Sequence, residues 1–123
     1  MKERVIEEKS FEFSVMIVDA VRKMKKETHE YELASQLLRS GTSIGANVAE
    51  ARYAQSEKDF ISKHSIALKE ANEVKYWLKL LCAVGLMPEE TGRLLIGKAV
   101  ELIRILTSII QTTQNKHEKQ PEK

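Results

Sequence analysis

The chain has 123 residues, of which 42% are hydrophobic and 31% are charged, and its formal net charge is +2. This length allows one domain with one hydrophobic core and excludes a separate catalytic module. Charges of both signs are mixed along the chain, so the net charge alone gives little indication of an acidic partner. Because only five glycines and two prolines occur, we expect long helices with few interruptions.

Three features predict a cytoplasmic protein. The single cysteine, Cys82, cannot form an intrachain disulfide, which fits a reducing compartment. The first residues, MKERVIEEKS, are charged and lack the apolar run of a secretion signal. No run of about 18 apolar residues is present, so we expect no membrane-spanning helix.

Apolar residues at helical spacing predict four helices. Ser10 is a candidate N-cap for the first helix. Ser56 and Asp59 have the spacing of a capping box for the third helix, and Gly85 is its stop signal. Pro88 favours the start of the fourth helix. The expected helices cover about residues 10–26, 28–54, 56–84 and 88–114.

Short connections make consecutive helices antiparallel neighbours, so we expect an all-α, antiparallel up-and-down four-helix bundle over residues 1–114. The remaining residues, 115–123, are polar and have no apolar face, and we expect a flexible tail there. Gly41–Ser43 is a candidate kink in the second helix. The spacing of Gly41 and Gly45 also indicates a close helix–helix contact rather than a phosphate loop.

The apolar faces are wider than a monomeric bundle requires. Apolar residues of the fourth helix spread over about two-thirds of its circumference, and the third helix has a second apolar row opposite its core line. We expect these residues to form a homo-oligomer interface, unless a loop or the first helix covers them within a monomer. The expected interface residues are Ile66, Trp77, Leu80, Val84, Ile96, Val100 and Ile103.

The sequence predicts no catalytic residue, no metal site, no cofactor and no small-molecule substrate. A di-metal carboxylate bundle needs Glu-x-x-His pairs, and none is present. His64 lies on the core line of the third helix, where we expect a hydrogen-bonded packing residue. Cys82 lies in the same sector and is expected to act as a small buried hydrophobe.

One polar line has three open interpretations. Five polar residues between Gln36 and Glu50 share one face of the second helix, and the third helix adds Asn72 and Glu73. The line is a solvated face, a polar network that fixes helix register, or a catalytic groove with Glu50 as a base. Its members are Gln36, Arg39, Ser43, Asn47, Glu50, Asn72 and Glu73.

The densest cationic cluster is at the expected end of the first helix. Arg22, Lys23, Lys25 and Lys26 either complement the dipole at the helix C-terminus or contact phosphates.

The segment from Leu33 to Glu50, LASQLLRSGTSIGANVAE, resembles the bacterial four-helix-bundle family that includes the 23S rRNA intervening-sequence proteins. Accessory proteins of diversity-generating retroelements are related to this family. The segment SIGANVAE, residues 43–50, is similar to the family signature S-I-x-A-N-I-A-E, and Ala71–Val74 is similar to its small-x-E-hydrophobic segment. The resemblance covers about residues 10–112. Ala51 stands where the family typically has glycine.

The resemblance implies an up-and-down bundle that assembles as a ring-like homopentamer and has affinity for nucleic acid or a nucleoprotein partner. Our leading hypothesis is a non-enzymatic homo-oligomer that binds RNA or DNA through Arg22, Lys23, Lys25, Lys26 and Arg39. The alternative is a protein–protein adaptor ring without nucleic-acid affinity. A small enzyme built around Glu50, Asn47 and Asn72 is the third hypothesis.

Overall fold

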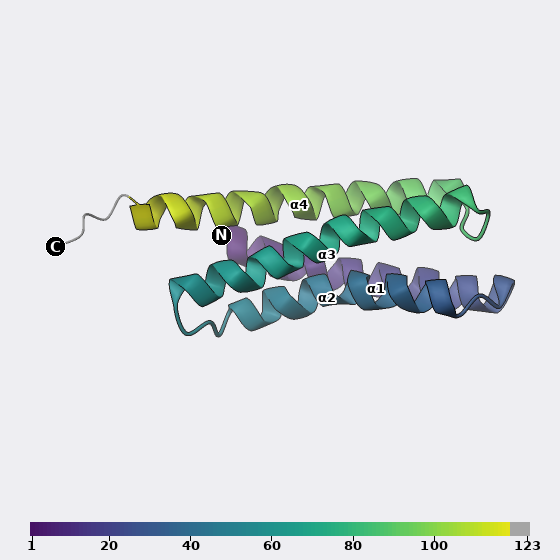
Figure 1. The fold of residues 1–123 in the computed structure, drawn as a ribbon, viewed down its shortest axis with the longest axis horizontal. Coiled ribbons are helices and arrows are strands. Elements are labelled where there is room, and N and C mark those ends of the chain that lie inside the picture. Colours follow the sequence, from purple (N-terminus) through teal and green to yellow (C-terminus); the bar gives the residue numbers. More distant parts are fainter. Residues whose placement is uncertain (119–123) are drawn as a thin grey trace.

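Four long α-helices run up and down along one axis (Figure 1). The computed structural model describes residues 1–118. Helix α1 covers Lys2–Thr28, α2 Glu32–Ala51, α3 Glu57–Ala83 and α4 Glu89–Glu118. Each helix packs against its neighbours along the chain, and α1 also packs against α4, which closes the bundle. The structure therefore confirms the expected all-α four-helix bundle. No helix in residues 1–118 is long and apolar enough to cross a bilayer.

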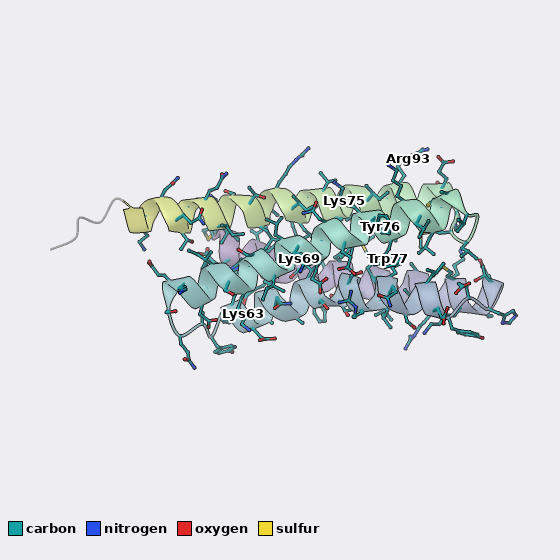
Figure 2. The ribbon with its side chains drawn as sticks, in the orientation of Figure 1. Lys63, Lys69, Lys75, Tyr76, Trp77 and Arg93 are labelled. Atoms are coloured by element: carbon teal, nitrogen blue, oxygen red, sulfur yellow. The ribbon has the colours of Figure 1, made fainter. Side chains whose placement is uncertain are left out.

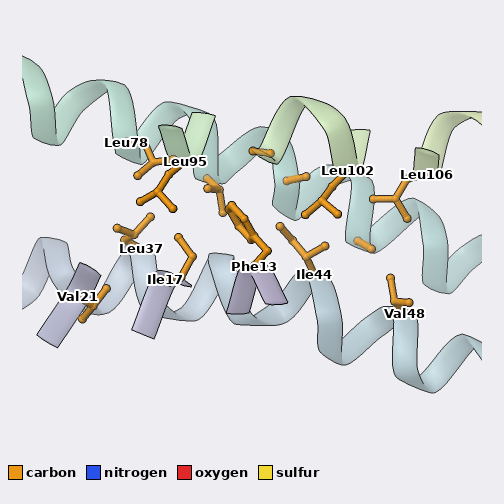
Figure 3. Packing of buried hydrophobic residues seen from close by; sticks show 14 of the residues in the cluster. Phe13, Ile17, Val21, Leu37, Ile44, Val48, Leu78, Leu95, Leu102 and Leu106 are labelled. Atoms are coloured by element: carbon orange, nitrogen blue, oxygen red, sulfur yellow. The ribbon is translucent and has the colours of Figure 1, made fainter. Parts of the chain in front are cut away.

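The core is one continuous cluster to which all four helices contribute (Figure 3). Phe13 and Ile17 of α1 face Leu37 and Ile44 of α2, and Leu102 of α4 lies across from them. Burial of each large apolar side chain contributes about 1.5–3 kcal/mol, so this cluster is the main source of stability. Its members recur every three or four residues on each helix, as the sequence pattern predicts. Further members of the cluster are Val21, Val48, Leu78, Leu95 and Leu106.

Helix α1 begins at Lys2, well before the expected start at Ser10. Ser10 is not an N-cap: it is buried inside the helix, and its hydroxyl donates to the Glu7 carbonyl oxygen at 3.3 Å. Ile6 precedes Ser10 on the same side of the helix and is fully buried in the core. The prediction was wrong because a serine in the core line resembles a cap, although its hydroxyl is satisfied within its own helix.

Helix α2 is shorter than expected at both ends. Thr28 belongs to α1, and His29 ends that helix in the left-handed conformation, with φ 59°. The N–H of His29 donates to the Lys25 carbonyl oxygen, as in a C-terminal cap. The helix α2 then runs without a break through the candidate kink at Gly41–Ser43.

The start and end signals of α3 act as predicted. The Ser56 hydroxyl accepts a hydrogen bond from the Asp59 N–H at 3.0 Å, which confirms the N-cap. The Asp59 carboxylate accepts from the Gln55 N–H at 3.3 Å, one residue before the partner expected in a capping box. Gly85 follows the helix with φ 77°, a conformation that favours glycine.

Helix α4 starts directly after Pro88 and extends to Glu118. Residues 115–118 of the expected flexible tail are therefore helical. Residues 119–123, the rest of that tail, lie outside the described residues.

Cys82 packs closely against α4. A Cβ atom added to Gly92 would lie 2.1 Å from the Cys82 sulfur, so the sulfur occupies the space beside this glycine. The thiol is half-buried, and burial raises its pKa. This contact fits the packing role expected for Cys82.

Gly41 and Gly45 lie where α1 and α2 pack closely together. A Cβ atom on Gly41 would lie 2.8 Å from both Cγ1 and Cγ2 of Ile17. A Cβ atom on Gly45 would lie 3.1 Å from the Ser14 hydroxyl and 3.2 Å from the Ser10 carbonyl oxygen. The structure therefore confirms that this glycine pair is a helix–helix contact.

We expect Gly41→Ala to destabilise the protein. Alanine gains about 1 kcal/mol of helix propensity, but overpacking against buried Ile17 costs about 1–3 kcal/mol. The net loss in the free energy of unfolding, up to about 2 kcal/mol, can be measured by urea denaturation.

Gly97→Ala is the matched control. Gly97 is an exposed position in α4, and a Cβ atom there meets nothing within 4 Å, so this variant should be more stable than the wild type. Equal effects of the two substitutions would contradict a close α1–α2 contact at Gly41.

Candidate nucleic-acid interface

The cationic cluster lies in the last two turns of α1. Arg22, Lys23 and Lys26 are exposed, and Lys25 is half-buried. Among the side chains of residues 1–116, none of these four cations lies within 4.0 Å of a carboxylate oxygen. Their position at the C-terminal end of α1 suits both a dipole-complementing role and phosphate contacts.

Arg39, the fifth expected contact, has two carboxylate partners on α3. Its guanidinium pairs with Glu70 at 3.2 Å and also with Glu73. Burial raises the pKa of Glu70 and the Arg39 guanidinium opposes this rise, whereas the hydrogen bond from Trp77 lowers the pKa of Glu73. The two carboxylates compensate the Arg39 charge, so Arg39 joins α2 to α3 and is poorly suited to bind phosphate.

The same group of side chains extends to two aromatic rings. The Trp77 indole N–H donates to Glu73 at 3.1 Å. The Tyr76 and Trp77 rings meet edge to face, with centroids 5.3 Å apart. A continuous chain of contacts therefore leads from Arg39 on α2 through Glu73 and Trp77 to Tyr76 on the outside of α3.

The remaining amides and hydroxyls of the motif bond to their own helices. The Ser43 hydroxyl donates to the Arg39 carbonyl oxygen, and Asn47 donates to the Ser43 carbonyl oxygen. Asn72 donates to the carbonyl oxygen of Leu68. One polar network links α2 to α3 through Arg39, Glu70 and Glu73 and extends to Trp77. The hydrogen bonds of Ser43, Asn47 and Asn72 stay within their own helices.

Glu50 is paired with a cation across α2 and α3. Its carboxylate lies 2.9 Å from Lys63 Nζ, and this hydrogen bond raises the pKa of Lys63. In residues 1–118 no hydrogen bond connects Glu50 with Asn47 or Asn72. The structure therefore shows Glu50 as the ion-pair partner of Lys63, without a hydrogen bond to either asparagine.

An open groove of about 1370 Å³ lies where α1 begins and α2 ends. His64 and Phe60 of α3 form part of its wall, and Arg52 and Glu7 pair at its rim, 3.3 Å apart. His64 is buried, and its Nδ1 is 2.9 Å from the Phe60 carbonyl oxygen. Burial lowers its pKa, so the neutral ring is favoured. The expected packing role of His64 is confirmed.

The expected oligomer residues do not form one exposed surface. Ile66 and Val84 of α3 are exposed, whereas Trp77, Leu80 and the three α4 residues Ile96, Val100 and Ile103 are half-buried. Trp77, Ile96 and Ile103 pack against the core of their own chain.

The most exposed apolar side chains on α1 lie off the core line. Phe11 is 69% exposed and Val15 48% exposed. Sequence reasoning missed this pair, although their spacing of four residues, outside the line of Phe13 and Ile17, indicates a second apolar face.

A second feature that sequence reasoning missed is an exposed polar and cationic line along α3. Its residues are spaced by three or four, and all are exposed. Figure 2 shows Lys69 and Tyr76 of this line, with Lys75 beside them. We call it the α3 line, and it consists of Lys58, Ser62, Ser65, Lys69, Asn72, Tyr76 and Lys79.

No group of three or more His, Cys, Asp or Glu side chains in residues 1–116 is placed to hold a metal ion.

The fold and its surface define a helical bundle with cationic and aromatic side chains on the outside. The family model of the 23S rRNA-intervening sequence protein matches residues 2–108. The chain therefore belongs to this family.

One similar solved structure is a protein with unknown function from the S23 ribosomal protein family of Bacteroides thetaiotaomicron. The two chains are 46% identical, and the match covers 90% of this chain and 99% of the other, with a TM-score of 0.88. The comparison with curated proteins finds no match.

We expect Arg39→Ala to destabilise the bundle by about 1 kcal/mol near pH 7.5, because it leaves the Glu70 carboxylate half-buried without a partner. Burial raises the pKa of Glu70, so this carboxyl becomes neutral early as the pH falls. The loss should therefore shrink at lower pH. Denaturation at pH 7.5 and pH 4.5 measures both effects.

Arg93→Ala is the control for an exposed ion pair. Arg93 and Glu89 are 3.7 Å apart and both are highly exposed, so the loss should stay below about 0.5 kcal/mol. An Arg39→Ala effect as small as this would contradict a structural role for Arg39.

We also expect the free energy of unfolding to fall as the pH decreases from about 7.5 to 5.5. The pKa of His64 is lower in the folded protein than in the unfolded chain, so protons bind the unfolded state first and stabilise it. His64→Gln should remove most of this fall, and His29→Asn, which replaces an exposed histidine, should retain it. Parallel stability curves for the wild type and His64→Gln would contradict this role.

Proposed function

We propose that this protein is a non-enzymatic, cytoplasmic homo-oligomer that binds RNA or DNA through cationic side chains displayed on its bundle. The observation that carries this proposal is the group of Arg22, Lys23 and Lys26, which are exposed and have no carboxylate partner among the side chains of residues 1–116. Cations free of local ion pairs are available to replace the counterions of a phosphate backbone.

Oligomerisation would multiply these contacts. The net charge of one chain is only +2, so one copy has a weak electrostatic attraction for nucleic acid. A ring, with five copies as the expected number, would present the α1 cluster several times to one ligand and increase the effective concentration of each contact. Exposed Phe11 and Val15 on α1, with Ile66 and Val84 on α3, are apolar surface that self-association could bury.

A protein–protein adaptor is the second candidate. It is favoured by the exposed apolar pair Phe11 and Val15. Phe11 lines the same groove as the small and exposed Ala46 and Ala49 of α2. Such a surface suits a protein partner better than a phosphate backbone.

We expect the protein to bind fluorescent structured RNA and duplex DNA with an affinity that falls steeply between 50 and 200 mM salt. Arg22→Gln/Lys23→Gln/Lys26→Gln should weaken binding and lower the slope of log affinity against log salt for duplex DNA by up to about 2.7 for each bound protomer. Fluorescence anisotropy measures the affinity, and light scattering on the same sample measures the mass against 14.0 kDa for one chain.

Arg4→Gln/Lys98→Gln/Lys116→Gln is the matched control, because it removes three exposed cations from other parts of α1 and α4. The control should bind more tightly than the α1 variant. An equal loss in both would mean that net charge and not the α1 cluster determines affinity. No binding at low salt would overturn the nucleic-acid proposal and favour the adaptor, and a mass of one chain would overturn the homo-oligomer.

A further inference from the structure

We propose that the α3 line binds single-stranded nucleic acid, with Tyr76 stacked on an unpaired base and Lys69 and Lys79 on the flanking phosphates. This inference rests on the proposed function and assigns it a surface and a form of ligand. It concerns a different part of the bundle from the α1 cluster.

The lysines of the α3 line are regularly spaced. Lys58, Lys69 and Lys79 follow one another on one side of α3 at intervals of about 15 Å, since a helix rises 1.5 Å per residue. Polar, uncharged side chains stand between these lysines, and Tyr76 lies between Lys69 and Lys79. An extended phosphate backbone that runs along α3 would meet a cation on each side of the aromatic ring.

The part of the α3 line on either side of Tyr76 carries no negative charge. The carboxylates of α3 in this region are Glu70 and Glu73, and both pair with Arg39 on the α2 side of the helix. The line from Lys69 to Lys79 contains no acidic residue. Half-buried Lys75 adds a further cation beside Tyr76. The field over this surface therefore attracts a polyanion.

The ring of Tyr76 is exposed and is supported by its neighbours. Tyr76 is 60% exposed, so its ring is accessible to a ligand. Its ring rests against Trp77 at an interplanar angle of 73°, and Trp77 is held by its hydrogen bond to Glu73. Glu73 is in turn paired with Arg39. A ring supported in this way loses little conformational freedom when a base stacks on it.

The exposed ring of Tyr76 fits a single strand and not a duplex. In a duplex the faces of the bases are covered by their neighbours, so one exposed ring on a convex helix cannot stack on them. In a single strand every base presents a face, and stacking on an aromatic side chain is independent of sequence. The α3 line therefore fits an unpaired strand or loop of RNA or DNA.

The test is a titration of the full chain with a 20-nucleotide oligothymidylate and with a 20-base-pair duplex, both at low salt. Trp77 is the only tryptophan, so its fluorescence reports on a base that stacks beside it. We expect quenching by the single strand. Tyr76→Ala should weaken single-strand binding about 5- to 100-fold and duplex binding less than about 2-fold, whereas Tyr76→Phe should retain single-strand binding.

Tyr53→Ala is the matched control, since Tyr53 is 81% exposed and lies outside the α3 line. Circular dichroism and thermal unfolding establish that each variant is folded. If Tyr76→Ala binds the single strand as tightly as Tyr53→Ala does, the proposed role of the α3 line is wrong. The proposed function then remains supported by any loss of binding in the α1 variant. If the wild type binds neither ligand, both the proposed function and the role of the α3 line are overturned.

Discussion

The arrangement of the bundle depends on how closely α1 can approach α2. Gly41 lies against the side chain of Ile17, and Gly45 lies against the α1 backbone at Ser10. A larger residue at Gly41 would have to displace the side chain of Ile17, and one at Gly45 would crowd the Ser10 carbonyl oxygen. The segment SIGANVAE thus contains one of these packing contacts, at Gly45, which is the variable position of the family signature.

The ion pairs of Arg39 connect this packing to the outer surface. Arg39 lies on the side of α2 that faces α3, where Glu70 and Glu73 compensate its charge. Arg39 offsets one of these two negative charges, and Lys69, Lys75 and Lys79 of α3 outnumber the charge that remains. The same contact positions Trp77, and through it the ring of Tyr76. Packing between helices, surface charge and aromatic exposure are therefore set by one group of side chains.

The sequence predicts the four helices and their order because apolar periodicity and terminal signals agree at Ser56 and Gly85. It fails at Ser10, because a buried serine bonded within its own helix cannot be distinguished from an N-cap serine by residue type alone. It also places Arg39 among the phosphate contacts, because a one-dimensional pattern does not show which carboxylates of another helix lie opposite. The α3 line could have been read from its spacing of three and four, whereas the support of Tyr76 by Trp77 requires the structure.

The contact between Cys82 and Gly92 has a consequence for how this chain can vary. The sulfur fills the volume that any side chain at position 92 would need, so the two positions share one space between α3 and α4. A residue larger than glycine at 92 is compatible with this bundle only if residue 82 becomes smaller at the same time. The two positions should therefore change together among relatives, as a correlated pair.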